Sequence, residues 1–286
     1  MATALNALSK WPGEEEAREA VLRLAERVSS EPQLCQSMEA KHVSNALNAL
    51  SKWPDQAKAR KAALRLAERV SSEPQLCQSM EAKHVVNALN ALSKWPDKEE
   101  AREAALRLAR RLESEPQLCQ SMDALEMFTA LNALSKWPDE VEARDAALRL
   151  AGRVSSDARL LHSMDMHHVI SALNALSKWP DQVEARDAAL RLVERLSSDA
   201  QLRQSMDARA VATALNALSK WPGQAEARDA ALRLAGRVAL EAGLCEAMDA
   251  WAMVNALNAL SKWPDEEEAR EAALRLAGRV SSEPQL

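Results

Sequence analysis

Apolar and polar positions along the chain follow a helical pattern that repeats every 42 residues. In the second full copy, apolar residues from Ala59 to Val70 recur at helical spacing with charged residues on the other side, which predicts an amphipathic helix that we call helix A. A second apolar series from Val85 to Trp95 predicts another helix, helix B. The repeating unit is therefore a pair of helices.

Proline residues mark the expected ends of these helices. Pro54 suits the entry to helix A, and the Ser-Ser-Glu-Pro segment at residues 71–74 interrupts the pattern, so we expect helix A to stop there. Residues 75–80 are long enough for one short helical turn, and helix B is expected to begin near Glu81. Pro96 should end helix B at Trp95, because the residue before a proline avoids the helical region.

A recurring Ser-Lys-Trp-Pro tetrapeptide sets the period without any gap. Its seven tryptophans are Trp11, Trp53, Trp95, Trp137, Trp179, Trp221 and Trp263. A fixed period of this length predicts an all-α fold, a right-handed α-solenoid in which each repeat contacts mainly its neighbours. We expect residues 1–286 to form one array of six complete units with partial units at its ends, taken from a longer array.

Composition narrows the class of protein but not the partner. The chain is 47% hydrophobic and 28% charged, as expected for a soluble helical protein, and no apolar run approaches the length of a membrane span. Its net charge of −5 argues against a uniformly basic nucleic-acid-binding surface, although it leaves the distribution of charge between faces open. We expect no membrane partner.

The cysteines share one repeat position, at Cys35, Cys77, Cys119 and Cys245. Stacked helices lie about 8–10 Å apart, whereas the Cα atoms of a disulfide lie about 4.4–6.8 Å apart. We therefore expect small packing residues in a reducing compartment.

Two further recurring features are expected to be structural. The helix A arginines Arg65 and Arg69 recur as Arg107 and Arg111, and an acid such as Glu103 precedes the first arginine of each pair by four residues, which predicts exposed ion pairs on a solvated face. The recurring tryptophan is expected to extend the apolar face of helix B and fill the joint, our term for the contact between one repeat and the next.

Helix B also carries a polar stripe. At about 100° per residue, Lys83, Asn87, Asn90 and Lys94 fall within about 60° of one another, opposite the apolar side. If helix B lines the inside of the superhelix, the stripe covers a concave surface. The asparagine and the second lysine are identical in every repeat, whereas the other two positions vary.

The stripe provides the candidate ligand-binding residues: Lys41, Asn45, Asn48, Lys52, Lys83, Asn87, Asn90, Lys94, Thr129, Asn132, Lys136, His167, Ser171, Asn174, Lys178, Arg209, Thr213, Asn216, Lys220, Trp251, Asn255, Asn258 and Lys262. A lysine in every repeat suits a regularly spaced anion such as phosphate, and the alternation of Asn, Thr and Ser suits discrimination between base edges. Flat or apolar side chains beside or on the stripe, such as Val86, Phe128 and Trp251, are expected to pack against bases. The first hypothesis is therefore a scaffold for single-stranded RNA, with about one base per repeat.

A protein-interaction scaffold is the alternative, with the same groove holding an extended segment or a helix of a host protein. The asparagines would then bind a peptide backbone, as they do in armadillo repeats, or would bond within the solenoid itself. Armadillo repeats usually pair that asparagine with a tryptophan one turn earlier, where this chain has residues such as Ser44 and Val86. Both hypotheses stay open, with a slight preference for RNA.

Enzyme chemistry lacks a sequence signature here. The histidines, His42, His84, His162, His167 and His168, have no metal-binding motif around them and are expected to be surface residues. We find no glycine-rich phosphate loop and no nucleophile with a distinguishing context. We therefore expect no catalytic residue, metal, cofactor or small-molecule substrate, and a monomeric scaffold.

The segment Leu-Asn-Ala-Leu-Ser-Lys-Trp-Pro at this period resembles the SKWP repeat family of type III effectors from plant-pathogenic bacteria. The resemblance implies a HEAT/armadillo-like solenoid inside a larger virulence protein, located in the bacterial cytoplasm before secretion and in the host cell after injection. Helix B, for example residues 85–94, is also similar to the second helix of octotricopeptide repeats, a modular RNA-binding family.

Overall fold

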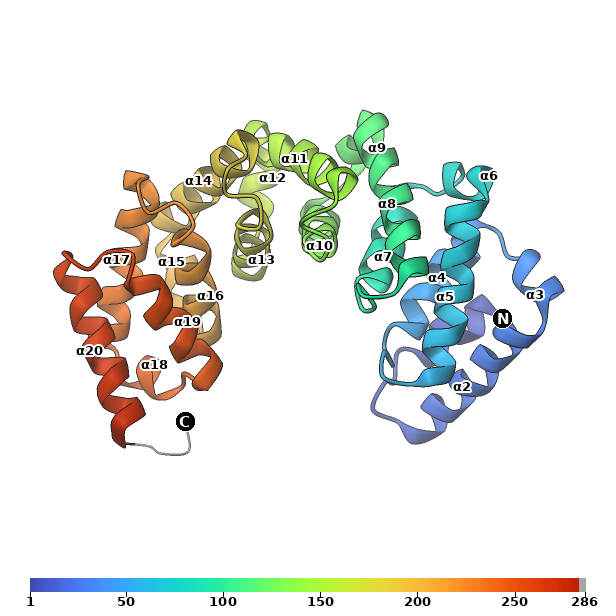
Figure 1. Ribbon diagram of the computed structural model, residues 1–286, viewed down its shortest axis with the longest axis horizontal. Coiled ribbons are helices and arrows are strands. Elements are labelled where there is room, and N and C mark those ends of the chain that lie inside the picture. Colours follow the sequence, from blue (N-terminus) through green and yellow to red (C-terminus); the bar gives the residue numbers. More distant parts are fainter. Residues whose placement is uncertain (283–286) are drawn as a thin grey trace. The chain divides into compact units, whose positions relative to one another are not determined.

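The computed structural model describes residues 1–282, and every regular element in that range is a helix (Figure 1). The chain divides into two compact units, one from Met1 to Leu150 and one that begins at Ala151. None of the helices in the described part is long and apolar enough to cross a bilayer.

In the first unit, the two helices of each repeat build two layers. Helix B of successive repeats is α1 (Ala2–Leu8), α4 (Ala40–Leu50), α7 (Ala82–Leu92) and α10 (Ala124–Leu134), and helix A is α2 (Glu15–Ser30), α5 (Ala57–Ser72) and α8 (Glu99–Ser114). Short helices follow helix A: α3 (Pro32–Gln36), α6 (Pro74–Gln78) and α9 (Pro116–Ser121). Helix A and helix B pack against their equivalents in the next repeat, as α4 does against α7 and α5 against α8.

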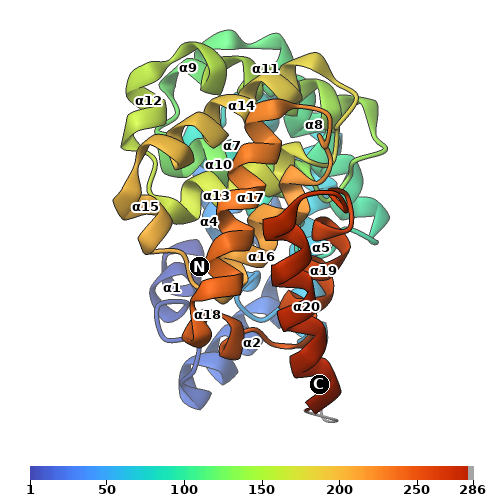
Figure 2. The same cartoon turned by 90° about the vertical axis from the view of Figure 1, so that its left-hand side faces the viewer.

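The second unit repeats this arrangement. Its helices are α12 (Ala158–Ser163), α13 (Met166–Leu176), α14 (Val183–Ser198), α15 (Ala200–Gln204), α16 (Ala208–Leu218), α17 (Ala225–Leu240), α18 (Ala242–Glu246), α19 (Ala250–Leu260) and α20 (Glu267–Ser282). The pair α19 and α20, packed on α16 and α17, faces the viewer in Figure 2. Helix α11 (Val141–Ser156) contains the division between the units.

The predicted all-helical α-solenoid is confirmed. Apolar side chains from both layers form the core between them, and Val85, Leu89 and Leu92 of helix B are fully buried. The predicted right-handedness and the single continuous array stay predictions.

Helix ends differ from the expected positions. Helix A begins at Ala57, three residues after Pro54, and continues through the two serines to Ser72. Helix B ends at Leu92 rather than at Trp95. The Trp95 N–H donates to the carbonyl of Leu92, so the chain already turns through tighter bonds before it reaches the proline.

The tryptophans fill the joints as expected and also form a hydrogen bond that the sequence did not indicate. The indole Nε1 of Trp95 donates to the carbonyl of Pro54 in the preceding repeat, at 3.0 Å. The same bond joins Trp137 to Pro96 in the first unit, at 3.0 Å. In the second unit it joins Trp221 to Pro180 and Trp263 to Pro222. Trp95 is 4% exposed, whereas Trp11, in the first repeat, is 57% exposed.

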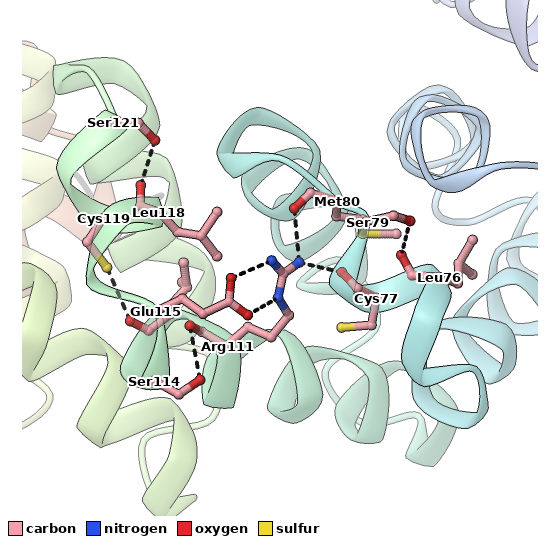
Figure 3. A network of polar contacts seen from close by, with 11 residues as sticks. Leu76, Cys77, Ser79, Met80, Arg111, Ser114, Glu115, Leu118, Cys119 and Ser121 are labelled. Atoms are coloured by element: carbon pink, nitrogen blue, oxygen red, sulfur yellow. Dashed lines mark hydrogen bonds and ion pairs between the residues drawn. The ribbon is translucent and has the colours of Figure 1, made fainter.

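The second arginine of helix A corrects the sequence interpretation. Arg111 is 8% exposed rather than solvated, and its guanidinium donates to the carbonyls of Cys77 and Met80 in the preceding repeat, the second at 2.9 Å. It also binds both carboxylate oxygens of Glu115, at 2.8 and 2.7 Å (Figure 3). The guanidinium therefore links helix A to the short helix before it.

This arginine bridge recurs in other repeats. Arg69 donates to the carbonyls of Cys35 and Met38, and Arg279 to those of Cys245 and Met248. Hydrogen bonding to the arginine lowers the pKa of Glu73 and of Glu115, and hydrogen bonding to Glu115 raises the pKa of Arg111. Arg195 departs from this pattern: it binds Asp199 at 2.7 Å, and its buried Nε has no partner among residues 1–282.

The expected ion pair at the first arginine of helix A forms between the exposed Glu19 and Arg23, at 3.5 Å. No such pair joins Glu103 and Arg107 in the described residues, and the stronger pairs of helix A lie between the second arginine and the acid four residues after it. Cys35, Cys77, Cys119 and Cys245 are all buried and free of disulfides, which agrees with the expected packing role. The reducing compartment stays a prediction. Burial also raises the pKa of the Cys35 and Cys77 thiols.

We expect Trp95→Phe to lower the free energy of unfolding by about 1–3 kcal/mol, because the Pro54 carbonyl then loses its buried donor. Trp11→Phe, at an exposed site without that bond, is the matched control and should change it by less than about 0.5 kcal/mol. Urea denaturation of both variants provides the measurement. Equal effects would show that the indole bond does not hold the joint.

Arg111→Met should lower the free energy of unfolding by about 2–3 kcal/mol, because two carbonyls of the preceding repeat and one carboxylate lose a charged donor. The control is Arg27→Met, since Arg27 is exposed and its guanidinium binds the Glu31 carboxylate. Its cost should stay below about 1 kcal/mol. Guanidinium chloride titration compares the two, and a similar cost at both sites would contradict the role of the bridge.

Candidate ligand-binding face

The polar stripe lies on the side of helix B that faces away from the core. In the third repeat, Lys83 is exposed and Asn87 and Asn90 are half-buried on α7, opposite the buried Val85 and Leu89. Lys94 follows the helix end and lies in the turn before Pro96, so its position is set by that turn and not by the helix.

All of the candidate residues reach the surface. Exposed are Lys41, Lys52, Lys83, Lys94, Lys136, His167, Lys178, Arg209, Lys220, Trp251, Asn258 and Lys262; half-buried are Asn45, Asn48, Asn87, Asn90, Thr129, Asn132, Ser171, Asn174, Thr213, Asn216 and Asn255. Short polar side chains therefore form the floor of the stripe, and long basic or aromatic side chains form its edges. The expectation that the stripe is concave stays a prediction.

The invariant lysines of the first unit lie close enough to affect one another. Desolvation lowers the pKa of Lys94, and the positive charges of Lys136 and Lys52 lower it further. None of the invariant lysines forms an ion pair with another residue of the described chain. By contrast, helix A carries compensated charge between repeats, such as Lys58 with Glu26 at 2.8 Å.

The invariant asparagines keep their side-chain amides unbonded. The serine of the tetrapeptide bonds to the backbone carbonyl of the asparagine and not to its side chain. Ser51 Oγ donates to the carbonyl of Asn48 at 2.9 Å, and Ser93 Oγ donates to that of Asn90 at 2.8 Å. The described residues therefore show no side-chain bond of the kind expected if the asparagines bonded within their own solenoid. Each half-buried amide offers two donors and an acceptor to water or to a ligand.

The variable polar position behaves in two ways. Thr213 donates to the carbonyl of Arg209 at 2.8 Å, and Asn255 donates to that of Trp251 at 2.7 Å, so these side chains bond one turn back along their own helix. Asn45, Asn87, Thr129 and Ser171 make no such bond within the described residues and are half-buried. Their hydrogen-bonding capacity is available at the surface.

An aromatic contact joins two repeats at the edge of the stripe, and sequence reasoning missed it. The guanidinium of Arg209 lies 4.9 Å from the ring centroid of Trp251, a cation–π geometry. The two residues occupy the same repeat position 42 residues apart, and this spacing is the feature of the sequence from which the contact could have been predicted. The contact shows that equivalent stripe positions of α16 and α19 touch.

The apolar residues beside the stripe correct one expectation. Val86 is 3% exposed and Ile170 6%, and the equivalent Ser44 donates from the joint to the carbonyl of His84 at 3.0 Å. These positions pack against the neighbouring repeat, so Val86 cannot contact a base. Phe128 is half-buried.

The histidines differ in exposure. His162 and His167 are exposed as expected, but His168 caps helix α13 through reciprocal bonds with Asp165, at 2.9 and 3.3 Å. His42 and His84 are half-buried, and the buried Nδ1 of His84 has no hydrogen-bond partner within residues 1–282. No group of three or more His, Cys, Asp or Glu side chains within the described residues is placed to hold a metal ion.

Comparison with known proteins adds little to this geometry. No protein-family model matches the chain, and no curated protein matches it. Among solved structures, the chain is similar to a designed armadillo repeat protein in complex with the peptide (KR)4, with 19% identity, coverage of 84% of this chain and 99% of that chain, and a TM-score of 0.28. The assignment of the fold to the α-solenoids of helical repeats rests on the packing of the helices described above.

We expect Lys94→Gln to raise the thermal midpoint slightly at low salt, because it removes a desolvated charge between two like charges. The gain should shrink at high salt, where the charges are screened. Lys58→Gln, which breaks the pair with Glu26, is the control and should not stabilise the fold. Differential scanning calorimetry at two salt concentrations measures both, and a salt-independent gain would contradict repulsion between the lysines.

Proposed function

We propose that the chain is a non-enzymatic, modular binding scaffold that holds single-stranded RNA along the polar stripe, with about one base per repeat. The observation that carries this proposal is the recurrence, in every repeat, of an uncompensated lysine beside an asparagine amide with no partner in the described chain. Unpaired groups repeated on one face favour a ligand with repeating chemistry.

The lysines suit a phosphate backbone. They are exposed, they lack carboxylate partners, and in the first unit Lys52, Lys94 and Lys136 lie within electrostatic reach of one another. A chain of phosphates would neutralise this repulsion and release counterions, which favours binding at low salt. The net charge of −5 does not oppose the proposal, since the acidic residues paired between repeats belong to helix A, as Glu26 and Glu142 do, or directly precede it, as Glu140 does.

The half-buried positions suit bases. The amide of Asn90 and the neighbouring amide of Asn87 offer donors and acceptors side by side, whereas Thr129 and Ser171 offer a hydroxyl in the same place. Bases of a single strand expose their Watson–Crick edges, which is the surface that such side chains recognise. Arg209 and Trp251 supply a flat edge on which a base can stack.

A protein partner is the second candidate, favoured by the outer edge of the stripe. Leu125 is 56% exposed and Trp251 46% exposed at one repeat position, where Lys41 and Lys83 stand in other repeats. Mixed apolar and basic anchors are common in protein interfaces. Following the resemblance to SKWP repeats, this candidate is a type III effector scaffold that binds a host protein after injection.

Selection from randomised RNA pools tests the first candidate. The purified chain is incubated with single-stranded pools at two salt concentrations, and the bound fraction is sequenced. Enrichment of a short motif that changes at one position in Thr129→Asn would support base recognition by the stripe. Binding without sequence preference that disappears at moderate salt would contradict it and lead to a search for a protein partner.

Lysine variants test the phosphate contact separately. Lys94→Gln should weaken binding to the selected RNA and reduce the slope of log affinity against log salt by about 0.7, the value for one lost phosphate contact on a single strand. Lys61→Gln, an exposed lysine on helix A, is the matched control and should leave the slope unchanged. Fluorescence anisotropy measures both. Equal slopes for the two variants would exclude Lys94 as a phosphate ligand.

A further inference from the structure

Helix A of the second repeat, α5, carries a charge that its neighbours do not. It contains five basic residues and one acid, whereas α2 contains three basic residues and four acids, and α8 contains four of each. The difference arises at Lys58 and Lys61, because every other repeat has Glu or Asp at both positions, as α8 has Glu100 and Glu103. The second repeat has thus exchanged acidic for basic side chains at two positions of an otherwise nearly constant helix.

This exchange opposes the stability of the helix. Acidic side chains are favourable near the N-terminus of a helix, whereas basic ones oppose its dipole there. The first turn of α2 contains Glu15 and Glu16, and that of α8 contains Glu99 and Glu100, but the first turn of α5 contains no acid. Both lysines are exposed, so packing does not require them. A local choice that works against folding indicates a role in recognition.

Arg60, which lies between the two lysines, has lost the acids that neutralise its equivalents. In the third repeat, Arg102 pairs with Glu140 of the next repeat at 3.1 Å, but the residue in that place beside Arg60 is Lys98. Other equivalents pair with the acid that follows them directly in helix A, and here that residue is Lys61. Within residues 1–282, neither Arg60 nor Lys61 forms an ion pair.

The unpaired cations line a cleft on the exposed side of α5, which packs between α2 and α8 (Figure 1). This α5 cleft has a volume of about 290 Å³, and Arg60, Lys61, Leu64 and Arg65 line it along the helix. Arg65 also lacks an ion pair in the described chain, because Lys61 replaces the acid that binds its equivalent in the first repeat. Leu64 is half-buried and adds an apolar contact between the cations.

Two carboxylates line the same cleft, those of Glu68 one turn after Leu64 and of Glu100 on α8. At the preceding joint, the same two positions hold the ion pair of Glu26 and Lys58, at 2.8 Å, and the following joint also has an ion pair there. At this joint both positions are acidic, and neither forms an ion pair within the part of the chain that the structure describes. The cleft therefore offers unpaired cations, an apolar side chain and unpaired carboxylates along one helix.

We propose that the α5 cleft is a docking site for a segment of a partner protein that carries acidic side chains, then an apolar residue, then a basic residue. Its carboxylates pair with Arg60 and Lys61, and its apolar side chain packs on Leu64. Its basic side chain binds Glu68 and Glu100. A nucleic-acid backbone fits less well, because its phosphates would meet these two carboxylates. The site lies in the helix A layer, so it is independent of the polar stripe on helix B and of the function proposed for that stripe.

Selection of phage-displayed random peptides on the 286-residue chain tests the proposal. Selected peptides are synthesised, and their binding is measured by fluorescence anisotropy at low salt. They should share the order acid, apolar, base. Lys61→Glu should weaken their binding about five- to tenfold and Arg60→Gln about three- to fivefold, because each removes a cation from an exposed charge pair. Selection without enrichment would overturn the proposal, and so would peptides whose binding both variants leave unchanged.

The matched control is Arg233→Glu, an exposed change of the same sign at the equivalent of Arg65 in helix α17, and it should leave peptide binding unchanged. Lys61→Glu should keep the fold, since the third repeat has Glu103 in this place, and circular dichroism checks the helix content. Equal losses in the two variants would reduce the effect to net charge and overturn the proposal. A loss of affinity for single-stranded RNA in Lys61→Glu would assign the cleft to nucleic acid instead, whereas retained RNA binding separates it from the stripe.

Glu100→Lys tests the order of charges along the cleft. A lysine in this place should pair with Glu68, as Lys58 pairs with Glu26 at 2.8 Å, so the cleft no longer binds the basic residue of the partner. A selected peptide with that residue changed to alanine should bind the original chain about three- to fivefold more weakly than the parent peptide. The Glu100→Lys chain should bind both peptides equally. The same loss in both chains would overturn the proposed register.

Discussion

Main-chain carbonyls at the joints are the acceptors on which the rest of the array depends. Each joint described within a unit receives an indole donor from one side chain and, in most repeats where the bond is described, a guanidinium from another. Both donors bond to the backbone of the preceding repeat. A buried carbonyl without a donor is costly, so these bonds specify the register of one repeat on the next and add direction to the apolar contact between them. The helices alone, rich in alanine and leucine, would pack in several ways.

The sequence predicted the helices and the repeat well, because a 42-residue period and helical spacing are local signals. It missed the two joint bonds because the two partners of each bond lie in different repeats, 41 residues apart for the indole bond of Trp95 and 34 or 31 residues apart for the bonds of Arg111. The acceptor is also a backbone carbonyl, which no residue type marks. The amphipathic pattern therefore placed Arg111 on the solvated side, although its side chain reaches into the joint. The end of helix B was also misplaced, since the turn at Ser93 closes before Pro96 acts.

The sequence predicted which positions form the candidate stripe, but not which of their polar groups are free to form hydrogen bonds. Helical geometry placed Asn90 and Lys83 on the surface, whereas the availability of the asparagine amide depends on which groups lie within reach, and only coordinates supply that. The same limit explains Val86, which the helical wheel put beside the stripe and the next repeat covers. The buried apolar side chains and the polar stripe occupy opposite sides of helix B, so the stripe can vary between repeats without loss of packing.

The acceptors at the joints are backbone carbonyls, so the side chains of the short helix are not needed to bind the arginine of the next repeat. The position of Cys77, whose carbonyl accepts from Arg111, holds Arg203 two repeats after Cys119 and still accepts from Arg237. A unit inserted or removed as a whole would meet the same acceptors at its new boundaries. The gene can thus lengthen or shorten the array by unequal recombination between near-identical repeats, without a compensating change elsewhere.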